Sequence, residues 1–302
     1  MVDDKRRIDQ PTGTETVGHE WDGIEELNTP LPRWWLWTLY ATIVWAIAYT
    51  VAYPAWPMIR ESTAGVLNWS SRGQLDKQLA AEQMRKAPIV NAIAATPIGE
   101  LENDPRLMQA AVEGGRAAFR QNCVQCHGSG AAGSKGYPNL NDDDWLWGGD
   151  MASIHYSIEH GIRNPGGDKT RMSQMPAFGR DGLLQPAEIE DLTAYVRTVS
   201  RQGRVDPSAK RGAALFQTNC AACHGTDARG NREFGAPNLT DAIWLYGGDE
   251  ESVRTSIHDA RFGVMPAWGG KLDPATTKML AVYVHSLGGG ERQRVQMAKK
   301  DK

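Results

Sequence analysis

The sequence has few cysteines and no excess of basic charge. Only four of its 302 residues are cysteine, too few for a disulfide-stapled scaffold of this length, and all four fall in two short clusters. Its 33 lysines and arginines are outweighed by 36 aspartates and glutamates, so the net charge is −3. No basic field exists to gather a polyanion, and we therefore expect no nucleic-acid partner. The clustering of the cysteines indicates ligation or attachment sites.

The sequence contains one long hydrophobic run. Residues 34–53 carry no charged side chain, and a helix of that length crosses the ~30 Å hydrocarbon core of a bilayer. Tryptophan and tyrosine flank the run at both ends, as is typical of headgroup boundaries. A cleaved signal peptide or a buried helix are the alternatives, but 33 residues with eight acidic side chains precede the run. We expect a tail at 1–33 and one transmembrane helix at 34–56.

The rest of the chain contains one pattern twice, at residues 104–204 and 205–290. Each copy has, in order, a C-x-x-C-H cluster, a Pro-Asn-Leu string, a Trp-Leu-aromatic-Gly-Gly-Asp string, a Met-Pro-Ala-aromatic-Gly string and a closing helical pattern. Trp145 and Trp244 are 99 residues apart, whereas Met175 and Met265 are 90 apart. The first copy therefore has a nine-residue excess before Met175, in a stretch of Gly, Pro and Asn that favours a loop.

Helical signals dominate both copies. Each begins with Asp-Pro, which is typical of a helix start, and ends with apolar residues at spacings of three and four, over residues 186–200 and 274–287. Strand signals are few. Residues 57–103 are expected to form a linker or docking arm with a short amphipathic helix at Leu75, Leu79 and Met84, and residues 291–302 a polar tail. The expected fold is mainly α, with one transmembrane helix followed by two small α domains.

The two clusters have the pattern of covalent haem attachment. Two thiols three positions apart can reach the two vinyl groups of one haem, and the adjacent histidine places an imidazole under the iron. The expected attachment residues are Cys123 and Cys126 in the first copy and Cys220 and Cys223 in the second, with His127 and His224 as the first axial ligands. Zinc is the main alternative, but zinc ribbons pair their C-x-x-C knuckles at closer spacing than the 97 residues found here.

A second axial ligand is expected from the repeated methionine strings. A lone methionine is usually core filler, but Met175 and Met265 recur in matching strings, each followed by a proline that stiffens the loop. His/Met coordination fills both axial positions of the iron and suits one-electron transfer. The sequence leaves open whether each methionine serves its own copy or the other. Four other histidines do not recur and are expected to have structural or surface roles: His155, His160, His258 and His285.

These motifs carry a family resemblance. The repeats are similar to class I cytochrome c domains over nearly all of residues 104–290. The string HEWDGIEELNTPLPRWW at residues 19–35, followed by one span and two such domains, resembles the dihaem cytochrome c subunit (subunit III, CcoP-like) of cbb3-type cytochrome c oxidases. The resemblance implies two covalently bound haem c groups. It also implies a single-pass protein of the bacterial inner membrane, with its tail in the cytoplasm and its cytochrome domains in the periplasm.

The resemblance also implies a function and partners. Electrons from a cytochrome c donor would pass through this chain toward the monohaem cytochrome c subunit and the catalytic haem-copper subunit of the same complex. The lone span contains no histidine, so we assign this chain no catalytic residue. Two alternatives remain: a stand-alone, membrane-anchored dihaem shuttle, and an enzyme resembling dihaem peroxidases, which would need one iron with an open or displaceable ligand.

Overall fold

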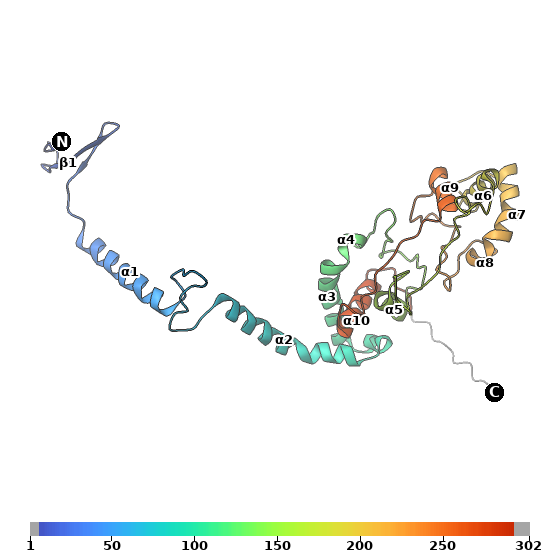
Figure 1. Ribbon diagram of the computed structural model, residues 1–302, viewed down its shortest axis with the longest axis horizontal. Coiled ribbons are helices and arrows are strands. Elements are labelled where there is room, and N and C mark those ends of the chain that lie inside the picture. Colours follow the sequence, from blue (N-terminus) through green and yellow to red (C-terminus); the bar gives the residue numbers. More distant parts are fainter. Residues whose placement is uncertain (1–5, 293–302) are drawn as a thin grey trace. The chain divides into compact units, whose positions relative to one another are not determined.

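A computed structural model describes residues 6–292, and these are mainly helical (Figure 1). The chain divides into two compact units, Met1–Arg85 and Lys86–Lys302. The predicted polar tail at 291–302 lies almost entirely outside the described residues. The described elements follow in chain order: β1 Thr16–Trp21, β2 Ile24–Leu27, α1 Arg33–Ala52, α2 Ser71–Ala95, the 3-10 helix η1 Ile98–Asn103, α3 Pro105–Asn122, α4 Val124–His127, α5 Met151–His160, α6 Pro186–Val199, α7 Pro207–Asn219, α8 Ala221–His224, α9 Glu250–Asp259 and α10 Pro274–His285.

The first unit contains an antiparallel hairpin that the sequence interpretation did not anticipate. Strand β1 pairs with β2, and Trp21 lies opposite Ile24 across the turn. The two turn residues, Asp22 and Gly23, have positive φ angles of 48° and 85°. Asp-Gly is the residue pair that such a two-residue turn favours, so a strand signal was present within the expected tail at 1–33.

Helix α1 corresponds to the predicted transmembrane segment. By length and composition it is long and apolar enough to cross a membrane, and none of its residues is buried within the protein. After it the chain turns back: the N–H groups of Val66 and Leu67 donate to the carbonyls of Val51 and Ala52 at 2.9 and 3.1 Å. These bonds satisfy carbonyls that a helix end otherwise leaves without partners.

Helix α2 is longer than the short amphipathic helix expected there. It runs for 25 residues and contains Pro88. The three side chains on which the expectation rested, Leu75, Leu79 and Met84, are all exposed. Its apolar contacts lie further on, where Ile93 is fully buried against residues of η1, α3 and α10. The last turns of α2 thus belong to the packed second unit.

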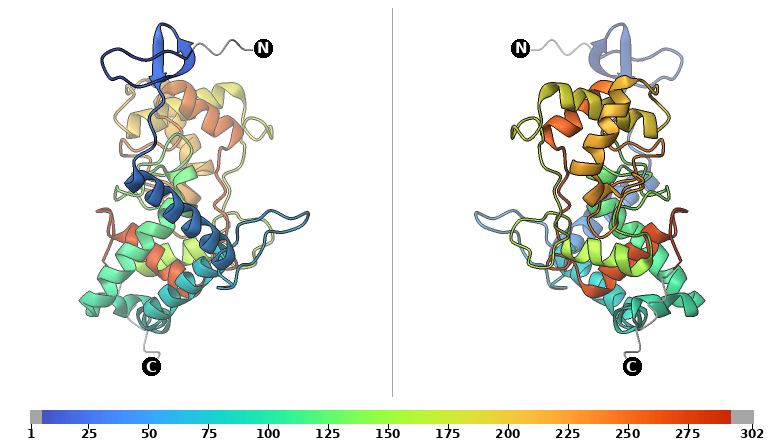
Figure 2. Two further views of the ribbon diagram at one scale, coloured as in Figure 1. Left: turned by 90° about the vertical axis from the view of Figure 1, so that its left-hand side faces the viewer. Right: turned by 90° about the vertical axis from the view of Figure 1, so that its right-hand side faces the viewer.

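The second unit contains two groups of helices, and each group combines both sequence repeats. Helix α3 of the first copy packs on α10 of the second, and α10 also packs on α5. Helix α6 of the first copy packs on α7 and α9 of the second. Figures 1 and 2 show these two groups as separate clusters of helices. The closing helix of each repeat therefore packs against the opening helix of the other repeat.

Glycines allow the opening and closing helices to cross closely. A Cβ atom on Gly115 would lie 2.0 Å from the carbonyl oxygen of Met279 in α10. A Cβ atom on Gly212 would lie 2.0 Å from the carbonyl oxygen of Asp191 in α6. Gly115 and Gly212 hold the same position in the two repeats, four residues before a buried phenylalanine. The two crossings are therefore built alike.

The predicted helix starts are confirmed. The Asp104 carboxylate accepts hydrogen bonds from the N–H groups of Arg106 and Leu107, and the Asp206 carboxylate accepts one from Ala209. These bonds satisfy amide donors that the first helical turn leaves free. The closing helices begin at the predicted prolines, Pro186 and Pro274, and end within two residues of the expected positions.

Candidate functional site

Each C-x-x-C-H cluster forms a single helical turn directly after an opening helix. Cys123 follows the last residue of α3, and its N–H donates to the Phe119 carbonyl at 2.8 Å. The His127 N–H donates to the Cys123 carbonyl at 2.9 Å, which brings the histidine back over the first cysteine. The second copy repeats both bonds at Cys220 and His224. The two thiols and the imidazole of each cluster thus share one short, rigid element.

The two histidines are held in the form that binds iron. Nδ1 of His127 lies 3.2 Å from the carbonyl oxygen of Pro138, and Nδ1 of His224 lies 3.1 Å from that of Pro237. A carbonyl oxygen only accepts, so Nδ1 donates and Nε2 keeps its lone pair. Burial lowers the pKa of both imidazoles, which favours the neutral form. Both rings can therefore serve as axial ligands.

The first cysteine of each pair lies in an apolar setting. Burial raises the pKa of Cys123 and of Cys220 to about 11. The described cysteines form no disulfide. The two thiols are therefore neutral at pH 7, the form that adds across a vinyl group to give a thioether.

Met175 of the first copy lies at the cluster of the second copy. A cavity of about 600 Å³ is lined by Met175 together with Cys220, Cys223 and His224. Met175 also packs against the core around Phe216. The chain after Met175 is tied to α9, because the N–H groups of Phe178 and Gly179 donate to the carbonyls of Ile257 and His258.

Met265 of the second copy lies at the cluster of the first. It packs, as Cys123 does, against the core that contains Phe119. Its backbone forms an antiparallel bridge with Ile162, with both hydrogen bonds 2.9 Å long. Further on, the N–H of Trp268 donates to the Ile158 carbonyl in α5 at 3.0 Å. The two methionine loops are therefore exchanged between the repeats.

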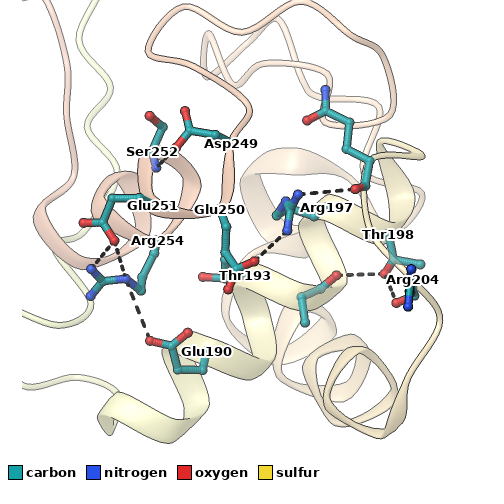
Figure 3. Close-up of polar contacts among 12 residues, drawn as sticks. Glu190, Thr193, Arg197, Thr198, Arg204, Asp249, Glu250, Glu251, Ser252 and Arg254 are labelled. Atoms are coloured by element: carbon teal, nitrogen blue, oxygen red, sulfur yellow. Dashed lines mark hydrogen bonds and ion pairs between the residues drawn. The ribbon is translucent and has the colours of Figure 1, made fainter.

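Side-chain contacts of the closing helices show the same exchange. The ring of Tyr195 in α6 lies 5.2 Å from that of Phe216, and the ring of Tyr283 in α10 lies 5.4 Å from that of Phe119. An ion pair joins Arg197 of α6 to Glu250 of α9 at 2.8 Å (Figure 3). Tyr195 and Tyr283 thus each pack on the phenylalanine of the other repeat.

The cavity beside His224 is large enough for a cofactor. The cavity beside His224 is lined largely by apolar side chains, among them Phe178, Leu192 and Val253, as a porphyrin needs. Outside this cavity, beside Arg171, the indole Nε1 of Trp147 is buried without a hydrogen-bond partner. A buried donor without a partner is costly, and an added acceptor would satisfy it. These residues fit a haem.

Trp145 and Trp244, which hold the same position in the two repeats, both have hydrogen-bond partners within the protein. Nε1 of Trp145 donates to the Gly289 carbonyl at 2.7 Å, and Nε1 of Trp244 lies 3.0 Å from the Gln202 amide oxygen in its corrected orientation. Two of the histidines set aside also bond to protein groups: Nε2 of His155 is 3.2 Å from Thr277 Oγ1, and Nε2 of His285 is 2.8 Å from the Glu291 carbonyl.

The sequence interpretation missed a pair of arginines. Arg171 and Arg261 each lie four residues before a methionine of the repeated string, a spacing that was visible in the sequence. Nε of Arg171 donates to Ser157 Oγ at 2.9 Å, and Nε of Arg261 donates to Ser256 Oγ at 3.1 Å. Each guanidinium thereby fixes the start of a methionine loop to the preceding helix, α5 or α9.

The chain matches three family models along its length. Residues 13–60 match the N-terminal domain of cytochrome oxidase-cbb3, FixP; residues 112–200 match cytochrome c; and residues 207–284 match cytochrome c oxidase, cbb3-type, subunit III. Two relatives cover almost the whole chain. The cbb3-type cytochrome c oxidase subunit CcoP of Cereibacter sphaeroides is 52% identical over 93% of this chain and 97% of its own length. The subunit FixP of Rhizobium meliloti is 50% identical over 96% of this chain and 100% of its own length.

Proposed function

Since this chain belongs to the CcoP/FixP family of cbb3-type cytochrome c oxidase subunits, we propose that each of its two haem irons is bound by the histidine of one repeat and the methionine of the other. The chain is an electron-transfer subunit of the oxidase and carries two covalent haem c groups. Haem 1 is attached at Cys123 and Cys126, with His127 and Met265 as ligands. Haem 2 is attached at Cys220 and Cys223, with His224 and Met175 as ligands.

The observation that carries this assignment is the exchange of the methionine loops. Met175 lines the cavity of His224, and Met265 packs against the same buried core as Cys123. The haem supplies one-electron redox chemistry when bound. The protein contributes a neutral imidazole on one side and a thioether on the other, which leaves no open position for oxygen or peroxide. Buried Phe216 lines the cavity beside His224, and the ring centre of buried Phe119 lies 6.4 Å from that of His127.

The proposed route begins at a cytochrome c donor and ends at the catalytic haem-copper subunit, with the monohaem cytochrome c subunit between. As a member of this family the chain is a subunit of the oxidase, so it contacts other oxidase subunits. Helix α1 anchors the chain in the bacterial inner membrane. We place the cytochrome repeats in the periplasm, where haem is attached to C-x-x-C-H motifs, and the β1–β2 hairpin in the cytoplasm.

Replacement of a methionine tests this function in the intact complex. Met265→His replaces a thioether with a more basic imidazole, which stabilises the ferric iron. We expect the midpoint potential of one haem to fall, this subunit's contribution to the near-infrared band of the sulfur–iron bond to weaken, and oxygen consumption with reduced cytochrome c to slow. Redox titration and oxygen polarography measure these changes.

The matched control is Met172→His, three residues before Met175 on an exposed side chain. It should leave the spectrum, both midpoints and the turnover rate unchanged. Two unchanged midpoints in Met265→His would contradict the methionine assignment. An altered spectrum with unchanged turnover would contradict the proposal that electrons pass through this haem.

A further inference from the structure

The cavity beside His224 is lined by two arginines. Arg163 and Arg261 both line this cavity. Tyr246 lines the same cavity, and burial raises its pKa while the two arginines oppose that rise. The Arg261 guanidinium stacks 4.9 Å from the Tyr246 ring centre, and that of Arg163 lies 5.8 Å from the Phe262 ring centre.

Within residues 6–292, neither guanidinium forms an ion pair. Arg163 donates to the carbonyls of Gly263 and Ser173 at 2.6 and 3.1 Å, and Arg261 donates to the Ser252 carbonyl and the Ser256 hydroxyl. Among the described residues, no carboxylate lies within 4.0 Å of either. The cavity also holds two carboxylates, Asp142 and Asp144, and one lysine, Lys135, but none pairs with these arginines.

Burial without a counter-ion is unfavourable for a cation. Arg163 is partly buried, and this burial lowers its pKa. A partly buried charge that faces only neutral acceptors is stabilised by an anion that enters with the ligand. The geometry of two fixed guanidiniums suits carboxylates, which accept paired N–H donors.

The sequence repeats contain a counterpart of Arg261 but none of Arg163. Arg171 is the counterpart of Arg261, and it stacks on Trp147 and Tyr156 at 5.2 and 4.8 Å from the ring centres. Arg163 has no counterpart, because it lies in the nine-residue excess of the first copy. The exchange of methionine loops brings this extra cation to the site of the second copy.

We propose that Arg163 and Arg261 bind the propionate groups of haem 2, and that Arg163 raises the midpoint potential of that haem. This inference rests on the proposed function only in placing a haem at Cys220 and Cys223. A fixed positive charge close to the porphyrin stabilises the ferrous iron, which carries one positive charge fewer than the ferric iron. Arg163 lines the cavity beside His224, so the effect is proposed for haem 2.

The test is Arg163→Gln in the purified oxidase complex, followed by redox titration of the two haems. We expect about a tenfold rise in the ratio of oxidised to reduced haem 2 at a fixed ambient potential, which corresponds to a midpoint ~59 mV lower. The haem 1 midpoint should not move. Redox-difference infrared spectra should show the propionate carboxylate bands shifted, a readout independent of turnover.

Two further variants separate charge from packing. Lys169→Gln removes an exposed cation from the same loop and should leave both midpoints in place. Arg163→Lys keeps the charge, so the haem 2 midpoint potential should stay close to that of the parent protein. If Arg163→Gln loses haem, the lysine variant tests whether the charge sets this midpoint. Unchanged midpoints and infrared bands in Arg163→Gln, or an equal drop in the lysine variant, would overturn the inference. Intact His/Met spectra in those variants would leave the proposed function standing.

Discussion

The two attachment sites share a backbone plan but differ in the charged side chains around them. Both have a C-x-x-C-H turn and a histidine bonded through Nδ1 to a proline carbonyl, and each copy carries an arginine four residues before the methionine that it gives to the other site. Only the site at His224 also receives Arg163 and Asp144, and both come from the first copy. A duplicated fold has therefore become two unequal sites because one repeat supplies side chains to the other.

The exchange also explains why the repeats form one packed unit. Opening helix α3 has its partner, α10, at the far end of the sequence, and α6 packs on α7 across the boundary between the repeats. Neither repeat contains a complete set of packed helices by itself. A substitution that destabilises one helix crossing should therefore also destabilise the methionine loop of the other repeat.

The largest effect is expected from closing the glycine crossings. In Gly212→Ala the new methyl carbon would meet the Asp191 carbonyl oxygen, and neither backbone can yield cheaply. Overpacking of this kind costs about 1–3 kcal/mol, more than the ~1 kcal/mol that alanine gains in a helix interior. Thermal loss of the methionine–iron band should occur at a lower temperature, and Gly115→Ala should behave in the same way.

Gly114→Ala is the matched control on α3. Its methyl group would meet the Sδ atom of Met279, the mobile end of a flexible side chain, rather than backbone. We expect unchanged or slightly raised stability. Equal destabilisation by Gly114→Ala and Gly115→Ala would show that the backbone contact between α3 and α10 is not what limits the crossing.

A smaller effect is expected from Asp144. Burial, with a contribution from Asp241, raises the pKa of this carboxyl to about 6. Below that pH the group is neutral, and as the pH rises through it the group gains a negative charge that favours ferric iron. The haem 2 midpoint should therefore fall between about pH 5 and 7, by less than the ~59 mV of a tenfold change. In Asp144→Asn this part of the pH dependence should disappear.

The neighbouring carboxylate provides the control. Asp143 is exposed, so Asp143→Asn should preserve the pH profile of the parent protein. Redox titrations at several pH values compare the three proteins. A pH profile in Asp144→Asn that matches the parent would assign the dependence to another group.

Local chemistry made much of this molecule predictable. The C-x-x-C-H turns, the Asp-Pro helix starts and the uncharged run of α1 each depend on neighbouring residues, and the structure has all three where the sequence indicated. The β1–β2 hairpin was missed although its Asp22-Gly23 turn was visible. Helix α2 was underestimated because its buried contacts begin only after the exposed part that suggested it.

The pairing of methionines with histidines was not predictable, because it depends on long-range packing. Met175 and Met265 have nearly the same local sequence, so the neighbouring residues do not indicate which of the two sites each methionine enters. The arginines show a second limit. Arg163 looked like an ordinary loop residue, and its place in the cavity of the other repeat follows only from the exchange.

The exchange of methionines is tested most directly in a complex that retains only one covalent haem in this chain. Cys123→Ala with Cys126→Ala should remove haem 1, which the pyridine haemochrome count verifies, and leave haem 2 with its sulfur–iron band. We predict that adding Met175→His abolishes the remaining band of this subunit and adding Met265→His preserves it. The reverse result, with the band lost in Met265→His and kept in Met175→His, would contradict the account.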